Sequence, residues 1–325
     1  MHILITGAAG MIGRKLTERL VTERALNGEV IDKLTLIDIV APARPPGFSD
    51  HVKTRAADLA DPGVAGKAVA ERPEVIFHLA GVVSGEAETD FDKGYRVNLD
   101  GSRALLEAVR ALDGYKPKFV FTSSIAVFGA PFPPSIPDEF HLTPLTSYGT
   151  QKAICELLLA DYSRRGLLDG VGIRLPTICV RPGKPNKAAS GFFSGIIREP
   201  LAGQEALLPV SESVRHTHAS PRAAVGFLIH AAGLSRDKLG PRVNLSMPGV
   251  SCTVGEQIEA LKRVAGDKVA ARIRRAPDPL VERIVSGWAE RLDARRAREL
   301  GFKAESSFDD IIRAHIEDEL GGKIA

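Results

Sequence analysis

Residues 3–13 read Ile-Leu-Ile-Thr-Gly-Ala-Ala-Gly-Met-Ile-Gly, so a glycine-rich turn directly follows a short apolar run. The run has the length and composition of a buried strand, and the turn opens a segment with helical periodicity. Glycine permits a tight turn and a close approach of the backbone, while a helix N-terminus offers free amide groups. The spacing is G-x-x-G-x-x-G, and its place between strand and helix predicts a pyrophosphate-binding turn.

Apolar runs alternate with amphipathic stretches through the first half of the chain. Strands are expected at residues 3–5, 34–37, 54–57, 75–79, 118–122 and 171–175, and helices at residues 13–23, 61–70, 94–112 and 149–165. Repeated strand-helix-strand units of this kind predict an α/β fold with a doubly wound parallel Rossmann sheet and right-handed crossovers.

The second half of the chain has a different pattern. After about residue 180 it consists of proline- and glycine-rich loops and separate helices, including residues 257–265 and 279–298. We expect residues 1–178 to form a nucleotide-binding Rossmann domain, to which residues 220–247 return as a helix and a strand. Residues 179–325 then form mainly a smaller, partly interleaved α/β substrate-binding region.

Composition excludes several classes of protein. The 325 residues are 44% hydrophobic and 26% charged, and the net charge of +3 is scattered along the chain, which argues against nucleic acid as a partner. Cys155, Cys179 and Cys252 lack the spacing of metal ligands, and reduced thiols are typical of a cytoplasmic protein. With neither an export signal nor an apolar run of membrane-spanning length, we expect a soluble, cytoplasmic chain without membrane contact.

Acidic and apolar residues at strand ends complete the predicted nucleotide site. Asp38 ends the second strand, where a carboxylate accepts hydrogen bonds from both ribose hydroxyls and repels a 2′-phosphate, which favours NAD over NADP. Asp58 and Leu59 follow the third strand and are candidates for the adenine. His78 lies inside an apolar run, so we interpret it as a packing residue.

Polar residues at the next strand end indicate a reaction centre. Thr122, Ser123 and Ser124 close the fifth strand, and Tyr148 and Lys152 lie four residues apart at the start of the following helix. Both places belong to the carboxyl edge of a parallel sheet, where such folds bind ligands. An ammonium group on the same helix face as a phenol favours the phenolate, so Tyr148 is a candidate proton acceptor.

In this order, the motifs strongly resemble the extended short-chain dehydrogenase/reductase family, also called the NAD-dependent epimerase/dehydratase family. The resemblance covers essentially the whole chain and implies that Tyr148 is the acid/base, with Lys152 stabilising its phenolate and binding the nicotinamide ribose. It also implies that Ser124 bonds the reacting oxygen and that Asn98 supports the lysine. The cofactor contacts that it implies are Gly7, Gly10, Met11, Ile12, Gly13, Asp38, Asp58, Leu59, Leu79, Ala80, Gly81, Asn98, Thr122, Tyr148, Lys152 and Ile178.

The loop after the sixth strand bears on the substrate. Residues 122–129 and 181–192 resemble the branch of the family typified by D-erythronate dehydrogenase, which implies NAD-dependent oxidation of a small sugar acid at a secondary alcohol, giving the 2-oxo acid. A carboxylate substrate needs fixed cationic or amide donors. The candidate substrate contacts are Ser123, Ser124, Tyr148, Lys184, Asn186, Lys187, Ser190 and Arg215. His216 and His218 lack a third ligand, so we predict no metal.

Two alternatives remain open beside this dehydrogenase. A nucleotide-sugar 4-epimerase is the first, although this chain lacks the Arg-x-x-Asn strand end and the Tyr-Gly-Pro that are common in such enzymes, and residues 123–125 lack the dehydratase Thr-Asp-Glu. The second is a sensor that binds NAD without turnover. The family resemblance also implies a homodimer formed through the helices near residues 94–112 and 149–165.

Overall fold

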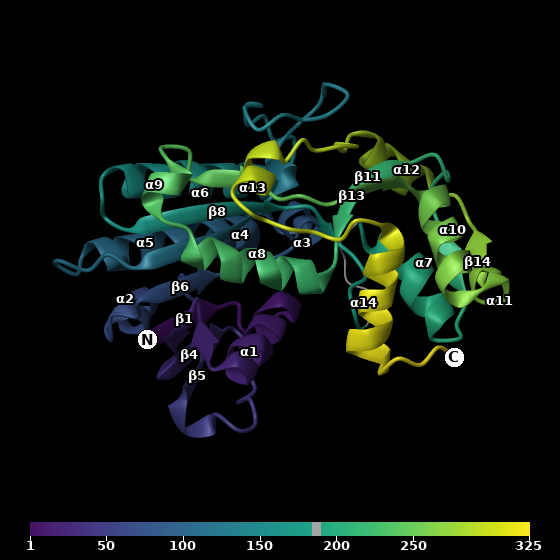
Figure 1. Cartoon of the computed structure of the whole chain (residues 1–325). Coiled ribbons are helices and arrows are strands. Elements are labelled where there is room, and N and C mark those ends of the chain that lie inside the picture. The colour runs from purple at the N-terminus through teal and green to yellow at the C-terminus, as the bar shows by residue number, and fades with distance from the viewer. Residues whose placement is uncertain (184–189) are drawn as a thin grey trace.

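A seven-stranded parallel sheet is the centre of the computed structural model, which describes residues 1–183 and 190–325 (Figure 1). Its strands are β1 (His2–Thr6), β4 (Lys33–Asp38), β5 (Val52–Ala56), β6 (Val75–His78), β7 (Lys118–Ser124), β8 (Asp169–Leu175) and β12 (Asn244–Ser246). They lie in the order β12-β8-β7-β6-β1-β4-β5, and each paired neighbour runs parallel. The chain order reverses beside β1, which confirms the predicted doubly wound α/β fold.

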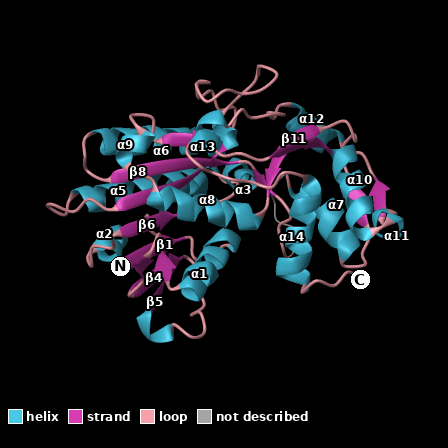
Figure 2. Ribbon diagram, in the orientation of Figure 1, coloured by secondary structure: helices cyan, strands magenta, loops and turns pink. Residues whose placement is uncertain are grey.

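Helices cover both faces of this sheet (Figures 1 and 2). One layer contains α1 (Met11–Glu23) and α8 (Pro221–Gly233), and the other contains α2 (Val64–Val69), α5 (Gly101–Arg110) and α6 (Ser147–Arg164). Because both faces are covered, the strands are continuous apolar runs: Ile3, Leu4 and Ile5 are each 0% exposed. Each such side chain contributes about 1.5–3 kcal/mol of burial free energy.

The second region has a hydrophobic core of its own and lies beside the carboxyl edge of the large sheet (Figure 1). Its elements are β9 (Thr177–Ile178), α7 (Gly191–Leu201), β10 (Ala206–Leu208), β11 (Arg215–Ala219), β13 (Val250–Thr253), α10 (Val254–Ala265), α11 (Asp267–Ala270), β14 (Ile273–Arg275), α12 (Pro279–Ser286) and α14 (Phe308–Leu320). Helix α14 connects it to the large sheet, because Glu319 pairs with Lys15 of α1 and Asp318 pairs with Arg222 of α8.

Two segments return from the second half of the chain to the first core. The helix and strand expected within residues 220–247 are α8 and β12, and β12 pairs with β8. Ala294, Ala297 and Phe302 also pack into the core of the large sheet. The chain therefore passes between the two regions several times.

Two predicted helices differ from the structure. Residues 279–298 form α12 and α13 (Arg295–Glu299) instead of one helix, because α12 ends at Ser286 and the following chain makes a bridge between Leu292 and Ile136. Residues 94–112 begin as a π-helical segment, Tyr95–Asp100, and only then continue as α5. Segments of π-helix are rare and are frequently found at functional sites.

Within the two ranges that the structure describes, no helix has both the length and the apolar composition needed to cross a membrane.

Candidate active site

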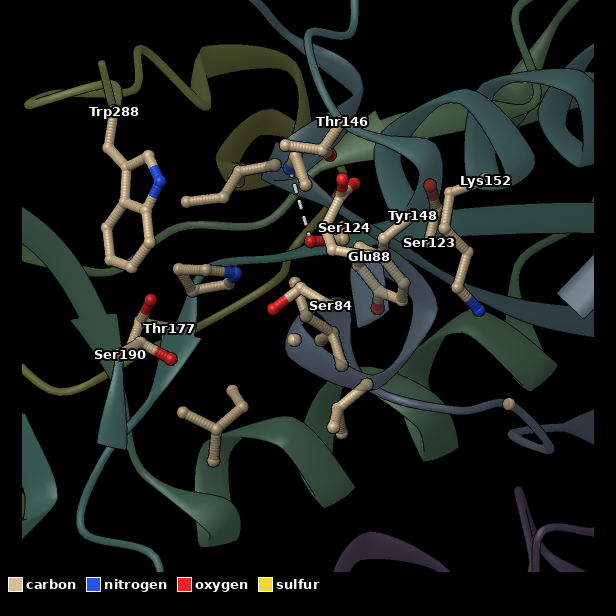
Figure 3. Close-up of a pocket in the computed structure, with 18 of the residues that line it drawn as sticks. Ser84, Glu88, Ser123, Ser124, Thr146, Tyr148, Lys152, Thr177, Ser190 and Trp288 are labelled. Carbon is tan, nitrogen blue, oxygen red and sulfur yellow. Dashed lines mark hydrogen bonds between the residues drawn. The ribbon is translucent and has the colours of Figure 1, made fainter. Parts of the chain in front are cut away.

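A cavity of about 830 Å³ lies where the carboxyl edge of the large sheet meets the second region. Figure 3 shows Ser124, Tyr148 and Glu88 on one side of it and Thr177, Ser190 and Trp288 on the other. Of the residues predicted for the cofactor and the substrate, those in its lining are Ile12, Leu79, Gly81, Thr122, Ser123, Ser124, Tyr148, Lys152, Ile178 and Ser190. The volume is ample for a small polar substrate beside one end of a dinucleotide.

Tyr148 lies in the first turn of α6, and two local features place that turn against the sheet edge. The Thr146 side chain caps the helix by accepting a hydrogen bond from the Gly149 amide at 3.0 Å. A Cβ atom on Gly149 would lie 2.1 Å from the Ala126 carbonyl oxygen, so only glycine permits this approach. The same contact brings the start of α6 next to the loop that follows Ser124.

Lys152 is buried one helical turn after Tyr148. Its Nζ donates to the Thr122 carbonyl oxygen at 2.8 Å and lies 5.8 Å from the centre of the Tyr148 ring and 4.8 Å from that of Phe121. A buried ammonium group is costly unless hydrogen bonds or aromatic faces compensate it, and both are present here. The positive charge is thus fixed beside the ring whose oxygen would become negative in a proton transfer.

Asn98 connects the strand end of β6 to α6. Its Oδ1 accepts from the Val82 amide at 2.8 Å, and its Nδ2 donates to Gln151 Oε1 at 2.7 Å. A Cβ on Gly81 would lie 2.9 Å from Asn98 Oδ1 and 3.6 Å from Lys152 Nζ. The structure therefore brings Gly81, Asn98 and Lys152 together, and the π-helical turn carries Asn98 into this position.

Ser124 and Ser123 have different surroundings although they are neighbours. Ser124 Oγ accepts from the Ala126 amide at 3.2 Å, so its own proton is free to be donated into the cavity. Ser123 is 3% exposed, and its hydroxyl donates to Glu156 Oε1 at 2.5 Å. Its proton is therefore committed to Glu156, which favours a supporting role over the predicted substrate contact.

Glu156 is also the partner of a buried arginine. The Arg174 guanidinium donates to Glu156 through Nε at 2.9 Å and Nη2 at 2.7 Å, and it lies 5.0 Å from the centre of the Phe128 ring. Two parallel hydrogen bonds of this kind fix both distance and orientation. The ion pair thereby connects α6, which carries Tyr148, to strands β7 and β8.

The glycine-rich turn has the geometry of a phosphate site. Gly7 has a φ of 74°, and a Cβ atom there would lie 2.6 Å from the Ala80 nitrogen. The N-cap of α1, Gly10, makes no side-chain capping bond, so the first-turn amides, which include Met11 and Ile12, remain available to an anion. A Cβ on Gly13 would lie 2.2 Å from the Gly7 carbonyl oxygen. These residues fit the pyrophosphate of a dinucleotide.

Asp38 ends β4 beside this turn. Its Oδ2 accepts from the Ala9 amide at 2.9 Å, which fixes the carboxylate next to the predicted ribose position. Asp58 is half-buried, accepts from the Ala60 amide at 2.9 Å and pairs with Arg96, while Leu59 packs into the core. Leu79 and Ala80 follow β6 and are half-buried on the other side of the turn.

Replacing Asp38 with Ala or Ser tests the ribose contact. We expect kcat/KM with NAD to fall by about 10 to 100-fold, because a charge-assisted hydrogen bond to a carboxylate contributes about 1.5–3 kcal/mol. The loss with NADP should be smaller, since removing the negative charge also removes repulsion of its 2′-phosphate. Glu29→Ala, at an exposed position of the same region, is the matched control. An unchanged ratio between the two cofactors would show that the ribose is bound elsewhere.

Burial keeps two histidines near the cavity neutral. His78 bonds Thr6 and Ser102, and burial together with the charge of Lys152 lowers its pKa to about 3. Burial lowers the pKa of His216 to about 4. Over residues 1–183 and 190–325, no group of three histidine, cysteine or acidic side chains is placed to hold a metal ion.

The predicted substrate residues divide into three groups. Ser190 lines the cavity, whereas Lys184, Asn186 and Lys187 lie outside the described residues. Arg215 is the third case: its guanidinium pairs with Glu256 at 3.1 Å and donates to the Ser251 carbonyl oxygen at 3.1 Å, and the cavity lining described does not include it. Neighbouring residues of a strand point to opposite faces, so with His216 facing the cavity Arg215 points away.

Sequence reasoning missed residues that the structure brings into the cavity. Arg181, Thr177, Trp288, Ser84 and Glu88 all belong to its lining. A signal was present for Thr177 and Arg181, since they lie two and six residues after the end of β8 at Leu175, at the edge where ligands bind. Trp288 is the only tryptophan of the chain, but nothing near it in the sequence indicates a cavity.

Comparisons with known proteins agree with this geometry. A family model described as NAD dependent epimerase/dehydratase family matches residues 3–219. D-erythronate dehydrogenase of Cupriavidus necator is 50% identical over 323 residues, which make up 98% of this chain and 98% of that protein. D-erythronate dehydrogenase of Haemophilus influenzae is 42% identical over 320 residues, covering 98% of this chain and 100% of that protein.

A solved structure is similar along the whole chain. It is described as the nucleoside-diphosphate-sugar epimerase from Agrobacterium tumefaciens, with a TM-score of 0.98 and 68% identity over 100% of this chain and 96% of that one. The predicted fold, family and cofactor are confirmed, and NAD is the cofactor that the family implies. The matched family model and two relatives of nearly equal length show that the chain belongs to the NAD-dependent epimerase/dehydratase family.

Proposed function

We propose that this chain oxidises the secondary alcohol of a small sugar acid such as D-erythronate to the 2-oxo acid, with NAD as the cofactor. The observation that carries the proposal is the cavity itself, which is lined by Ser124, Tyr148 and Lys152 on the sheet side and by Arg181 on the side of the second region. The names of the two relatives with 50% and 42% identity support this substrate class.

The chemistry follows from the positions of three side chains. Ser124 donates a hydrogen bond to the substrate oxygen, because its oxygen already accepts from the Ala126 amide while its proton is free. Tyr148 accepts the proton of the alcohol, and the Lys152 ammonium stabilises the phenolate that accepts it. When bound, NAD supplies the hydride acceptor. Each of these roles is part of the proposal.

Arg181 is the cation that we propose for the substrate carboxylate. Its Nε donates to the Ile178 carbonyl oxygen at 3.0 Å and its Nη2 to Ser190 Oγ at 3.3 Å, so the fork is fixed at the cavity wall. Burial lowers the pKa of Arg181, which is the signature of a poorly solvated charge. A carboxylate would restore the missing electrostatic interaction. Arg181 takes the role that we had predicted for Arg215.

The division of labour between the two regions is also a proposal. Residues 1–178 with residues 220–247 form the NAD-binding domain, in which Gly7, Gly10, Gly13 and Asp38 contact the adenosine diphosphate half. Most of residues 179–325 form the substrate-binding region, which contributes Arg181, Ser190 and Trp288 to the cavity. The support is the position of the cavity at the junction of the two hydrophobic cores.

A nucleotide-sugar 4-epimerase is the alternative enzyme. It is favoured by the description of the Agrobacterium tumefaciens structure, which is 68% identical to this chain. Against it, the strand end at residues 174–177 reads Arg-Leu-Pro-Thr, without the asparagine common in epimerases. A sensor that binds NAD without turnover is less well supported, because Ser124, Tyr148 and Lys152 are all present at the cavity.

A substrate screen separates these functions. Purified protein is incubated with NAD and a panel of four-carbon sugar acids, and NADH is followed by its absorbance. In parallel, it is incubated with UDP-glucose and UDP-galactose, and the sugars are separated by chromatography. We expect NADH with D-erythronate and no change in the UDP-sugars. Interconversion of the UDP-sugars without NADH would favour the epimerase, and neither reaction would favour the sensor.

A homodimer and a cytoplasmic location complete the proposal. Leu157 of α6 is 65% exposed, so an apolar side chain remains open on one of the helices that are expected to form the interface. Phe91, which is 58% exposed, lies just before the other. Gel filtration at the mass of a monomer would contradict the dimer.

The cysteines support the proposed cytoplasmic location. Cys155, Cys179 and Cys252 are free and buried thiols, as expected in a reducing compartment.

A further inference from the structure

Thr177 and Ser190 are the hydroxyl groups on the wall of the cavity opposite Ser124 and Tyr148 (Figure 3). Thr177 begins β9, which pairs with β11 through His218. The rings of Trp288 and His216 and the apolar α12 side chains of Leu280, Val281 and Ile284 also line the cavity. Thr177 and Ser190 therefore have few polar neighbours, and the hydrogen-bond partner that orients each hydroxyl can be identified.

The proton of His216 has a fixed position. Its Nδ1 lies 2.9 Å from the Ala289 carbonyl oxygen, and a carbonyl oxygen can only accept, so Nδ1 carries the proton. Burial lowers the pKa of His216 to about 4, so the ring is neutral near pH 7 and Nε2 is a bare acceptor. The ring stacks on Phe193 at 5.4 Å with an interplanar angle of 5°, which fixes its orientation.

Thr177 is therefore polarised by His216. Its Oγ1 lies 2.8 Å from His216 Nε2, and since Nε2 can only accept, Thr177 must donate its hydroxyl proton to the ring. With its proton donated to the ring, the Thr177 oxygen has only lone pairs to offer to any other partner. Toward the cavity, Thr177 is an acceptor.

Ser190 has the opposite polarity. Its Oγ accepts from Arg181 Nη2 at 3.3 Å, so its proton remains free to be donated. Arg181 and Ser190 thus offer donors to an anion, whereas Thr177 offers an acceptor nearby on the same wall. A molecule that bears both a carboxylate and a hydroxyl group matches this pattern of donors and acceptor.

We propose that Thr177 is a specificity-determining residue, which accepts a hydrogen bond from a substrate hydroxyl other than the one that is oxidised. The hydrogen-bonded series from Ala289 through His216 to Thr177 makes this position disfavour groups that can only accept, such as a keto oxygen or a second carboxylate. The inference rests on the proposed function, because D-erythronate carries two hydroxyls beyond the reacting carbon. Thr177 would then be the polar group that distinguishes one of those hydroxyls from other substituents.

Kinetics with hydroxyl-deleted substrates test the role of Thr177. We compare kcat/KM for D-erythronate with that for two analogues, one lacking the hydroxyl on carbon 3 and one lacking that on carbon 4. The unaltered enzyme should prefer D-erythronate to one of these analogues by about tenfold, the order of a single hydrogen bond that is left unmade. Thr177→Val should lose about tenfold on D-erythronate and nothing further on that analogue. Thr177→Ser, which restores the hydroxyl, should recover most of the preference.

A second pair of variants changes the hydrogen-bond partner of Thr177 and leaves Thr177 itself in place. His216→Gln can place an acceptor near the position of Nε2, whereas His216→Asn can keep the bond to Ala289 but not that acceptor. We expect the preference for the hydroxylated acid to persist in His216→Gln and to weaken in His216→Asn. A loss of NADH affinity would show that Thr177→Val does not fold. In that case, the two His216 variants test the polarity of Thr177 on their own.

The outcomes distinguish this inference from the proposed function. If Thr177→Val loses the same factor on all three acids, or loses nothing on any, Thr177 does not bind a substrate hydroxyl. Equal preferences in the two His216 variants would likewise overturn its polarisation by the ring. If the unaltered enzyme turns over none of the acids, the proposed function fails, and the inference fails with it.

Discussion

Replacing Tyr148 with Phe should lower kcat for D-erythronate by about 10² to 10⁴-fold, the usual contribution of a general acid or base. The substitution removes one oxygen atom and keeps the ring, which lies 5.8 Å from Lys152 Nζ. That oxygen is the atom beside Lys152 that we propose as the acceptor of the alcohol proton. The measurement is the initial rate of NADH formation at saturating NAD.

Binding of the cofactor serves as the control for Tyr148→Phe. Trp288 is the only tryptophan and lines the cavity, so quenching of its fluorescence by NADH reports occupancy independently of turnover. We expect NADH affinity within a few-fold of that of the unaltered enzyme. A kcat within tenfold of the original, with the cofactor bound, would show that another group accepts the proton.

Replacing Glu156 with Ala should lower the free energy of unfolding by about 3–5 kcal/mol, because it leaves the guanidinium of Arg174 buried without its partner. Glu156 is 0% exposed and Arg174 is 7% exposed, so water cannot replace the lost hydrogen bonds. For a protein of this size, we expect Tm to fall by roughly 10 °C. The activity should fall as well, since Glu156 accepts from Ser123, the neighbour of Ser124.

Two further variants test whether the loss of stability comes from burial of the Glu156–Arg174 pair. Glu259→Ala removes the exposed partner of Lys262 on α10, and a surface pair of this kind contributes at most about 1 kcal/mol. The double substitution Glu156→Leu with Arg174→Met replaces the pair with apolar side chains and should recover most of the stability. If the Glu156→Ala variant melts within about 2 °C of the original protein, the buried pair is not the support that we describe.

Much of the first half of the fold could be predicted because its signals are local. A strand, a glycine turn and a helix succeed one another at residues 3–13, and polar residues of the predicted site, Asp38, Asp58 and Thr122, lie at the ends of three later strands. Parallel strands bring those ends to one edge, so chain order predicts that Asp38, Ser124 and Tyr148 lie along that edge, whereas the role of Ser124 is implied by the family resemblance. The structure confirms this sheet.

The second half could not be predicted to the same depth because its contacts are between distant segments. The sequence makes Arg215 a candidate for a carboxylate site, but β11 starts there and its guanidinium pairs with Glu256. Trp288 lies in the loop after α12, where no local pattern indicates the cavity that it lines. The pair of Glu156 and Arg174 is invisible to sequence patterns, since burial of both partners depends on how α6 lies on β7 and β8.

Transfer of deuterium from substrate to cofactor tests the central claim most directly. The enzyme is given NAD and D-erythronate that carries deuterium on carbon 2, and the NADH formed is analysed by mass spectrometry. We predict NADH with one deuterium and the 2-oxo acid in equal amounts, because the hydrogen on the oxidised carbon is the one transferred. Formation of unlabelled NADH, or of no NADH, would contradict the oxidation of carbon 2 by this site.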